Sequence, residues 1–238
     1  MVHKPNEIVI IGGGNSVQEG LRLGLGGVLA SKCVIALNYA FRYVPSTFMC
    51  FVDKELYHPN QGNIKNGKYV DISEELKPLP LIIGSFDTDI DKMKYPNTHL
   101  FPVSGEYHRE DSLTKGIYKP TLCGLFGLTI AAYLLDFKGT IYLLGYDWSR
   151  NDKEPTHFYS DIHHRGMGYT AFYERHKPEA HFKPFIEEKN LKIYNVSLNS
   201  NIDCFEKISY PTMLDKLNNI SYNQEELRTF IKEALCIK

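Results

Sequence analysis

The stretch Glu7-Ile8-Val9-Ile10-Ile11-Gly12-Gly13-Gly14-Asn15-Ser16 decides the fold, because it is typical of a buried strand that runs through a glycine turn into a helix. Residues 8–11 are apolar and β-branched, as expected of a parallel strand that is covered on both faces. Glycine has no Cβ, so the turn can approach an anionic ligand closely, and Ser16 can cap the following helix. The turn therefore predicts a site for a phosphorylated small molecule.

Two departures separate this turn from the dinucleotide-binding fingerprint. Val17 stands where that fingerprint has its third glycine, and Asn38 stands where it has an acidic residue after the second strand. No carboxylate is thus offered to ribose hydroxyls. Asn15 and Asn38 instead predict an amide-lined pocket that reads a base or a ribose. On the motif alone, a tight strand-to-helix turn without a ligand is the alternative.

Composition is that of a globular protein. The chain has 238 residues, of which 43% are hydrophobic, and residues 1–238 are expected to form a single nucleotide-binding α/β domain. A formal net charge of −1 and the lack of a long Lys/Arg run argue against nucleic acid as a partner. Five widely spaced cysteines, no signal peptide and no transmembrane segment predict a cytoplasmic protein. Association into a homo-oligomer is left open.

The order of the remaining segments predicts a Rossmann-like, doubly wound α/β fold with a mainly parallel sheet. Residues 33–37 and 48–52 are short apolar runs that end in Asn38 and Asp53, and polar side chains at the carboxyl ends of parallel strands commonly face a ligand. A helix is expected over residues 16–25, ended by Gly24, Gly26 and Gly27. Further segments are expected as strands at 79–83, 98–103, 140–145 and 191–196, and as helices at 121–136 and 223–234.

The segment 146–183, after the strand that ends at Gly145-Tyr146-Asp147, is a candidate active-site lid. It is dense in side chains that carry chemistry: Asp147, His157, Tyr159, Asp161, His163, His164, Arg165, Tyr169 and Tyr173. Histidine titrates near neutral pH, so His163 or His164 could act as a general base, while Tyr159 and Tyr169 could donate hydrogen bonds to a departing phosphate. A metal site is a second interpretation, although the spacing matches no compact metal motif. Solvent-exposed loop histidines are the third.

Five short motifs, taken in order, resemble a known family. They are Ile10-Ile11-Gly12-x-Gly14-Asn15-Ser16, Asn38-Tyr-x-Phe-x-Tyr43, Thr121-x-x-Gly124, Ile141-Tyr-Leu-x-Gly-x-Asp147 and Val196-Ser-x-Asn199-Ser200. Together with the histidine loop, this order is similar to that of the small bacterial sialyltransferases that use CMP-sialic acid. It also resembles the flagellar accessory and 6-hydroxymethylpterin diphosphokinase-like proteins. The resemblance spans most of residues 7–205.

The resemblance implies a set of nucleotide-binding residues. Gly12, Gly14, Asn15 and Ser16 would line the phosphate and ribose, Asn38 would contact the nucleotide, Thr121 and Gly124 would lie near the donor sugar, Asn199 and Ser200 near the base, and Asp147 in the same pocket. His163 or His164 would stand where the family has its base. Ser149 departs from the family, which has a tyrosine there to steady the leaving phosphate, so either Tyr159 replaces that tyrosine or the reaction differs.

The sequence therefore supports a glycosyltransferase-like enzyme that moves a sialic-acid-like sugar from a nucleotide donor, by preference a CMP-sugar, to a hydroxyl acceptor. The resemblance implies a single inverting displacement, and no cofactor or metal is required if tyrosines and helix amides neutralise the leaving phosphate. One alternative is a diphosphokinase-like transferase, in which Asp53, Asp147 and the histidines would surround Mg²⁺. The other is a non-catalytic nucleotide-binding or assembly protein.

Overall fold

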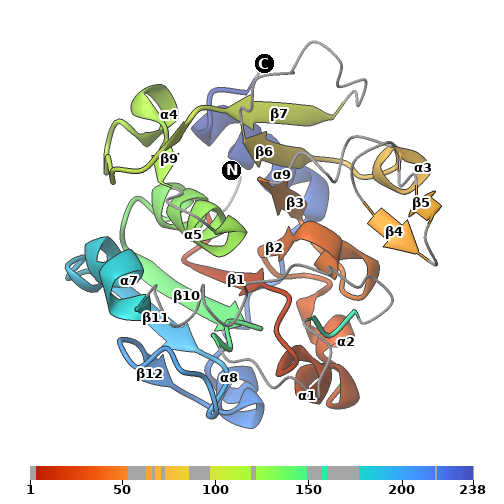
Figure 1. Ribbon diagram of the computed structural model, residues 1–238, viewed down its shortest axis with the longest axis vertical. Helices are drawn as coiled ribbons and strands as arrows, with labels where there is room; N and C mark the ends of the chain where they lie inside the picture. Colours follow the sequence, from red (N-terminus) through yellow and green to blue (C-terminus); the bar gives the residue numbers. More distant parts are fainter. Residues whose placement is uncertain are drawn as a thin grey trace.

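The computed structural model describes most of the chain. The described residues are 4–52, 63–65, 68–70, 73–85, 97–118, 122–148, 157–159, 177–217 and 219–237. Their helices lie on both sides of a central sheet (Figure 1).

Strand β1 (Glu7–Ile11) lies inside an eight-stranded sheet of order β12-β11-β10-β1-β2-β3-β6-β7, and each neighbouring pair in it is parallel. The fold is thus α/β and Rossmann-like, as predicted. The other strands of the sheet are β2 (Val34–Leu37), β3 (Phe48–Phe51), β6 (Ile82–Ser85), β7 (Thr98–Phe101), β10 (Gly139–Leu144), β11 (Leu191–Asn195) and β12 (Glu206–Lys207).

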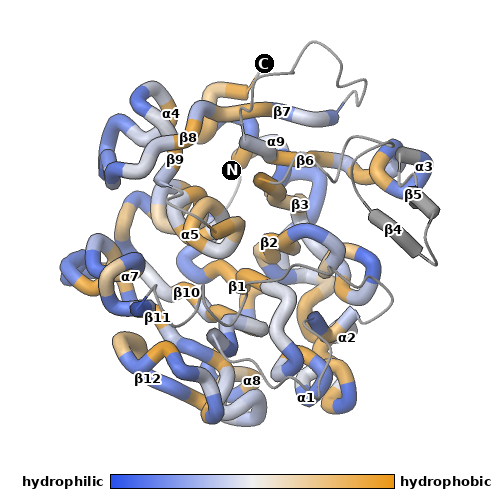
Figure 2. Tube along the Cα trace, viewed as in Figure 1, coloured by the Kyte–Doolittle hydropathy of each residue, from blue (hydrophilic) through white to orange (hydrophobic). Residues whose placement is uncertain are grey.

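The side chains of β1 explain why this strand is apolar at every position from 8 to 11. Ile8 and Ile10 face a core that contains α5 (Cys123–Leu134), whereas Val9 and Ile11 face a second core that contains residues of α1 (Val17–Arg22). All four are at most 1% exposed, because successive side chains of a strand point to opposite faces and helices cover both. Figure 2 shows β1 and its neighbours as a hydrophobic centre.

The helices after β1 differ from the prediction of one helix over 16–25. Gly24 takes a left-handed backbone (φ 80°) and divides the segment into α1 and α2 (Leu25–Leu29), and α2 contains the two glycines that were expected to end the helix. The final helix was predicted correctly: α9 (Gln224–Ala234) begins after Asn223, whose Oδ1 accepts hydrogen bonds from the amides of Glu225 and Glu226.

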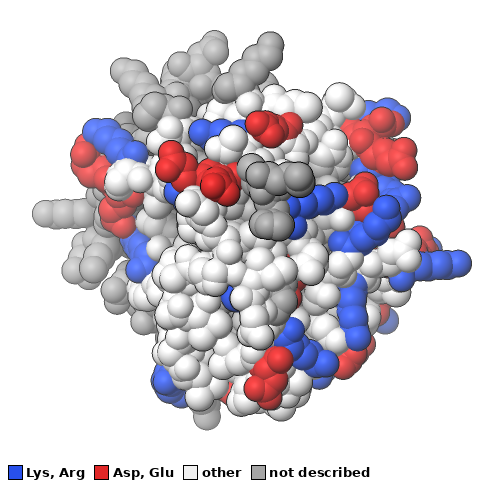
Figure 3. Space-filling model, turned by 180° about the vertical axis from the view of Figure 1, so that it is seen from behind, with Lys and Arg blue, Asp and Glu red and all other residues white. Residues whose placement is uncertain are grey.

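Other elements complete the layers around the sheet. They are the 3-10 helix η1 (Asn38–Arg42), β4 (Asn63–Lys65), β5 (Lys68–Val70), α3 (Ser73–Leu76), β8 (Val103–Ser104), α4 (Ser112–Lys115), β9 (Ile117–Tyr118), α7 (Pro178–Ile186) and α8 (Tyr210–Lys216). None of the helices within the described ranges combines the length and apolar character needed to cross a membrane. On the face shown in Figure 3, acidic and basic side chains are interspersed, so the described surface there has no field of one sign.

The path of the chain places a topological switch point at β1. From β1 the chain builds outward through β2, β3, β6 and β7, and then returns to add β10 on the other side of β1. The strand order therefore reverses between β1 and β10. In open α/β sheets, ligands bind outside the carboxyl ends of the strands at such a switch point. The glycine turn, Asn38 and Asp147 all follow strands that end there.

Candidate functional site

The glycine turn packs tightly against the end of β10. The amide of Gly12 donates to the carbonyl of Leu144 (2.7 Å), and the amide of Gly14 donates to the carbonyl of Gly145 (2.9 Å). A Cβ on Gly12 would lie 2.9 Å from the Gly145 oxygen, which is closer than real Cβ atoms come to a backbone oxygen. Gly12 and Gly14 thus allow the ends of β1 and β10 to approach each other. The sequence had instead predicted that these glycines make room for a ligand.

Ser16 and Asp147 form the next contact between these strand ends. The amide of Ser16 donates to Asp147 Oδ2 (2.9 Å), and its hydroxyl donates to Oδ1 (2.5 Å). Ser16 stands at the N-cap position of α1, but the prediction that its side chain caps the helix is wrong, because its hydroxyl donates to a carboxylate 131 positions away. A negative charge at the start of a helix is favourable. A donor phosphate that bound here would have to share the turn with this charge.

Tyr210, the first residue of α8, packs against α1, the helix that begins after Ser16. Its ring fills the space over Gly20, where an added Cβ would lie 2.3 Å from a ring carbon. The phenol is buried beside Ser16, and burial, followed by the charges of Asp147 and Glu19, raises the pKa of Tyr210 well above its usual value. Tyr210 therefore stays a neutral phenol that fixes α1.

Residues 157–159 of the predicted lid lie on the glycine turn. The amide of Phe158 donates to the carbonyl of Gly13 (2.9 Å), and the rings of His157 and Tyr159 stack with centroids 5.0 Å apart and planes at 13°. A Cβ on Gly13 would lie 2.2 Å from His157 Cδ2 and 2.9 Å from the Tyr159 hydroxyl oxygen. An imidazole and a phenol are thus held against the turn.

On the other side of the turn, Asn38 and Tyr39 follow β2. Asn38 has a left-handed backbone (φ 50°), and its buried Oδ1 accepts no hydrogen bond from the described residues. Tyr39 is 1% exposed, and its ring lies edge-on to that of Tyr159. Its buried hydroxyl likewise forms no hydrogen bond with the described residues. Burial raises the pKa of Tyr39. Buried polar atoms are costly when they lack a partner, so both atoms suit a ligand that supplies one.

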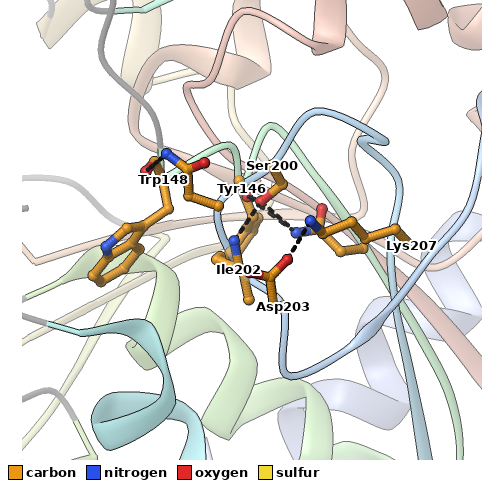
Figure 4. Close-up of polar contacts among 8 residues, drawn as sticks. Tyr146, Trp148, Ser200, Ile202, Asp203 and Lys207 are labelled. Carbon is orange, nitrogen blue, oxygen red and sulfur yellow. Dashed lines mark hydrogen bonds and ion pairs between the residues drawn. The ribbon is translucent and has the colours of Figure 1, made fainter.

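The loop after β11 is tied to the segment after β10 (Figure 4). The Ser200 hydroxyl donates to the carbonyl of Tyr146 (2.7 Å) and accepts from Asn195 Nδ2 (2.8 Å) and from the amide of Ile202 (3.0 Å). Ser200 is 3% exposed, whereas Asn199 is exposed. The expected contact of Ser200 with a nucleotide base stays a prediction that requires its bond to Tyr146 to break.

The remaining predicted residues divide into two groups. Gly124 lies in the first turn of α5, where its carbonyl accepts a hydrogen bond from the Tyr146 hydroxyl (2.9 Å) and an added Cβ would lie 2.9 Å from the Tyr146 ring. Asn15 lies half-buried in the turn itself. Others lie outside the described residues: Thr121, His163, His164 and Tyr169, together with Asp53, Ser149, Asp161, Arg165 and Tyr173. Within the described part of the chain, no three His, Cys, Asp or Glu side chains gather closely enough to hold a metal ion.

Sequence reasoning did not single out several residues that the structure brings to the ends of these strands. Tyr39 and Trp148 directly follow Asn38 and Asp147, which were chosen, and this adjacency was the available signal. His157 was named only as one member of a cluster. Tyr210 had no signal, because its role depends on the packing of α8 against α1. The part of the expected lid from Pro178 onward forms α7, whose Phe182 is 1% exposed.

The comparison with solved structures agrees with this architecture. A scan against protein-family models finds no match, and no curated protein matches the sequence. Among solved structures, the chain is similar to that of the MAf glycosyltransferase from Magnetospirillum magneticum AMB-1, with a TM-score of 0.54 and 13% sequence identity. The match covers 99% of this chain and 38% of that chain. At this identity the likeness shows the fold, and the chain spans well under half of its neighbour.

The turn can be tested with two Gly→Ala variants. Gly14→Ala would place a methyl group 2.7 Å from the Gly145 oxygen and 2.5 Å from Asp147 Oδ2, so we expect the free energy of unfolding to fall by about 1–3 kcal/mol in urea titrations. Gly27→Ala, in α2 with no atom within 4 Å of the new Cβ, should leave stability unchanged or raise it by up to about 1 kcal/mol. Equal effects of the two variants would contradict the packing described for the turn.

Proposed function

We propose that this protein transfers a sugar from a nucleotide donor to a hydroxyl acceptor at the carboxyl ends of β1, β2 and β10. The observation that carries the proposal is the stacked His157–Tyr159 pair on Gly13, because it brings a base and a hydrogen-bond donor to the switch point of the sheet. The likeness in fold to a structure described as a glycosyltransferase supports the same reaction class.

The donor is proposed to lie with its nucleotide towards Asn15 and Asn38, in place of the contact of the base with Asn199 and Ser200 that the resemblance implies. The unpartnered Oδ1 of Asn38 and hydroxyl of Tyr39 offer hydrogen bonds to a base or a ribose without adding a charge. The resemblance to enzymes that use CMP-sialic acid favours a CMP-sugar, with the phosphate near Gly12, Gly14 and Ser16. Asp147 holds Ser16, so its role here is to position the turn.

The reaction is proposed as one displacement. A neutral histidine takes the proton of the acceptor hydroxyl, and the acceptor oxygen forms a bond to the anomeric carbon on the face opposite the nucleotide. The bond from that carbon to the phosphate oxygen breaks, and its electron pair leaves with the nucleotide, so the configuration inverts. Tyr159 and Tyr169 are proposed to donate hydrogen bonds to the leaving phosphate. His163, His164 and, from its position on Gly13, His157 are the candidates for the base.

Single alanine variants of His157, His163 and His164 test the base. Removal of a general base costs about a hundredfold or more in rate, so one of the three should lose that much transfer from a CMP-sugar while its thermal shift with CMP stays as in the parent. His99→Gln, on β7 at the edge of the sheet, is a control for the loss of an imidazole away from the turn. Transfer within threefold of the parent in all three variants would refute a histidine base.

A second candidate function rests on Asp147. Because its carboxylate lies at the turn where a phosphate is expected, a divalent cation could bridge the two, as a Mg²⁺-dependent diphosphokinase-like transfer from ATP would need. The Asp147 oxygens are oriented by Ser16 and carry further lone pairs. A non-catalytic nucleotide-binding protein is the third outcome, recognised by binding without transfer.

Magnesium dependence separates these functions. If the sugar transferase is correct, CMP and a CMP-sugar should stabilise the protein equally with Mg²⁺ and with EDTA, by about 2.7 kcal/mol at a hundred times the dissociation constant. If the diphosphokinase-like function is correct, ATP should stabilise the protein only when Mg²⁺ is present, and Asp147→Asn should remove that stabilisation. Asp215→Asn, at an exposed position of α8, is the matched control for loss of a carboxylate.

A further inference from the structure

Trp148, which follows β10, has a costly backbone conformation. It follows Asp147 and lies in the left-handed region (φ 47°), which bulky residues rarely adopt. Asn201 holds it there: the Asn201 amide donates to the carbonyl of Asp147 (2.8 Å), and its Nδ2 donates to the carbonyl of Trp148 (3.1 Å). The structure therefore fixes the direction in which the indole leaves the end of β10.

The indole projects away from the cluster around Ser200, as Figure 4 shows. Its ring lies edge-on to Phe182 (centroids 5.9 Å, planes at 66°) and tilted against His181 (6.1 Å, 41°), both on α7. Phe182 in turn packs on Phe205 (5.2 Å) and is itself 1% exposed. The indole is half-buried, so it is anchored on a core aromatic while part of its surface stays accessible.

We propose that the indole of Trp148 is the surface on which the sugar ring of the donor stacks, with the His181 imidazole at its edge for a sugar hydroxyl. The inference rests on the proposed transfer from a nucleotide sugar and adds the location of the sugar. A pyranose presents C–H groups on its faces and hydroxyls at its rim, which suits an aromatic face with a polar neighbour.

Spacing across the sheet favours the sugar over the base at this position. Asn38 and Tyr39 follow β2, Trp148 follows β10, and β1 lies between these two strands. Two interstrand spacings separate them, about 9–10 Å. A ligand whose nucleoside lies at Asn38 therefore has to extend across the glycine turn to reach Trp148. Its phosphate would cross the turn, and its sugar would be the part that arrives.

The chain has one tryptophan, so its intrinsic fluorescence reports on Trp148 directly. We would titrate the protein with CMP, CMP-sialic acid, UDP-N-acetylglucosamine and UDP, with thermal shift as an independent measure of binding. A nucleotide sugar that binds should change the tryptophan emission and protect it from acrylamide, whereas its parent nucleotide should bind with little change. Equal changes in tryptophan emission with the nucleotide sugar and with its parent nucleotide would overturn the proposal and leave the transferase function standing. A thermal shift with the nucleotide sugar but no change in emission would do the same. A panel without any thermal shift would overturn both.

Variants provide the second arm of the test. Trp148→Ala should lower the affinity for the nucleotide sugar about tenfold and leave the affinity for the parent nucleotide within twofold of the unmodified protein. Trp148→Phe should recover part of the lost affinity, because it keeps an aromatic face. Ile186→Ala, at a 47% exposed position of the same helix α7, controls for general disturbance there. Equal losses for nucleotide and nucleotide sugar would show a structural role and contradict the sugar subsite.

Discussion

The contact between the β1 glycine turn and the end of β10 is the constraint on which the rest of the site depends. Amides of Gly12 and Gly14 bond to carbonyls at the end of β10, and the Asp147 carboxylate accepts both donors of Ser16. None of this is local in sequence. It joins β1 and β10, which lie more than a hundred residues apart in the sequence. It thereby positions the segment that follows β10 relative to the glycine turn.

On its two sides, that contact leaves strand ends of different chemistry, and each side is one half of the proposed site. On the β10 side, Ser16, Asp147 and Ser200 are engaged in hydrogen bonds within the protein. On the β2 side, Asn38 and Tyr39 keep buried polar atoms without partners in the described structure. The first half positions the backbone and carries the proposed sugar surface at Trp148, and the second is suited to the nucleoside. The His157–Tyr159 pair lies over the turn between them.

The central part of the fold could be predicted because it follows from local pattern. Four β-branched residues in a row require burial on both faces, and Ile8 to Ile11 are buried on both. Asn38 could be chosen because it ends a strand. The bond from Ser16 to Asp147 could not be predicted, since a helix cap and a distant carboxylate compete for the same hydroxyl and only packing decides between them. The glycines were recognised, but the atoms that require them, Gly145 and the His157 ring, are contributed by remote segments.

The central claim is that a nucleotide sugar occupies the carboxyl ends of β2, β1 and β10, and hydrogen–deuterium exchange tests it most directly. With a saturating nucleotide sugar identified by its thermal shift, amides in residues 36–43, 145–148 and 157–159 should gain protection, while those of α9, at 224–234, should exchange at an unchanged rate. Protection confined to other parts of the chain, with those three segments exchanging as in the free protein, would contradict the account.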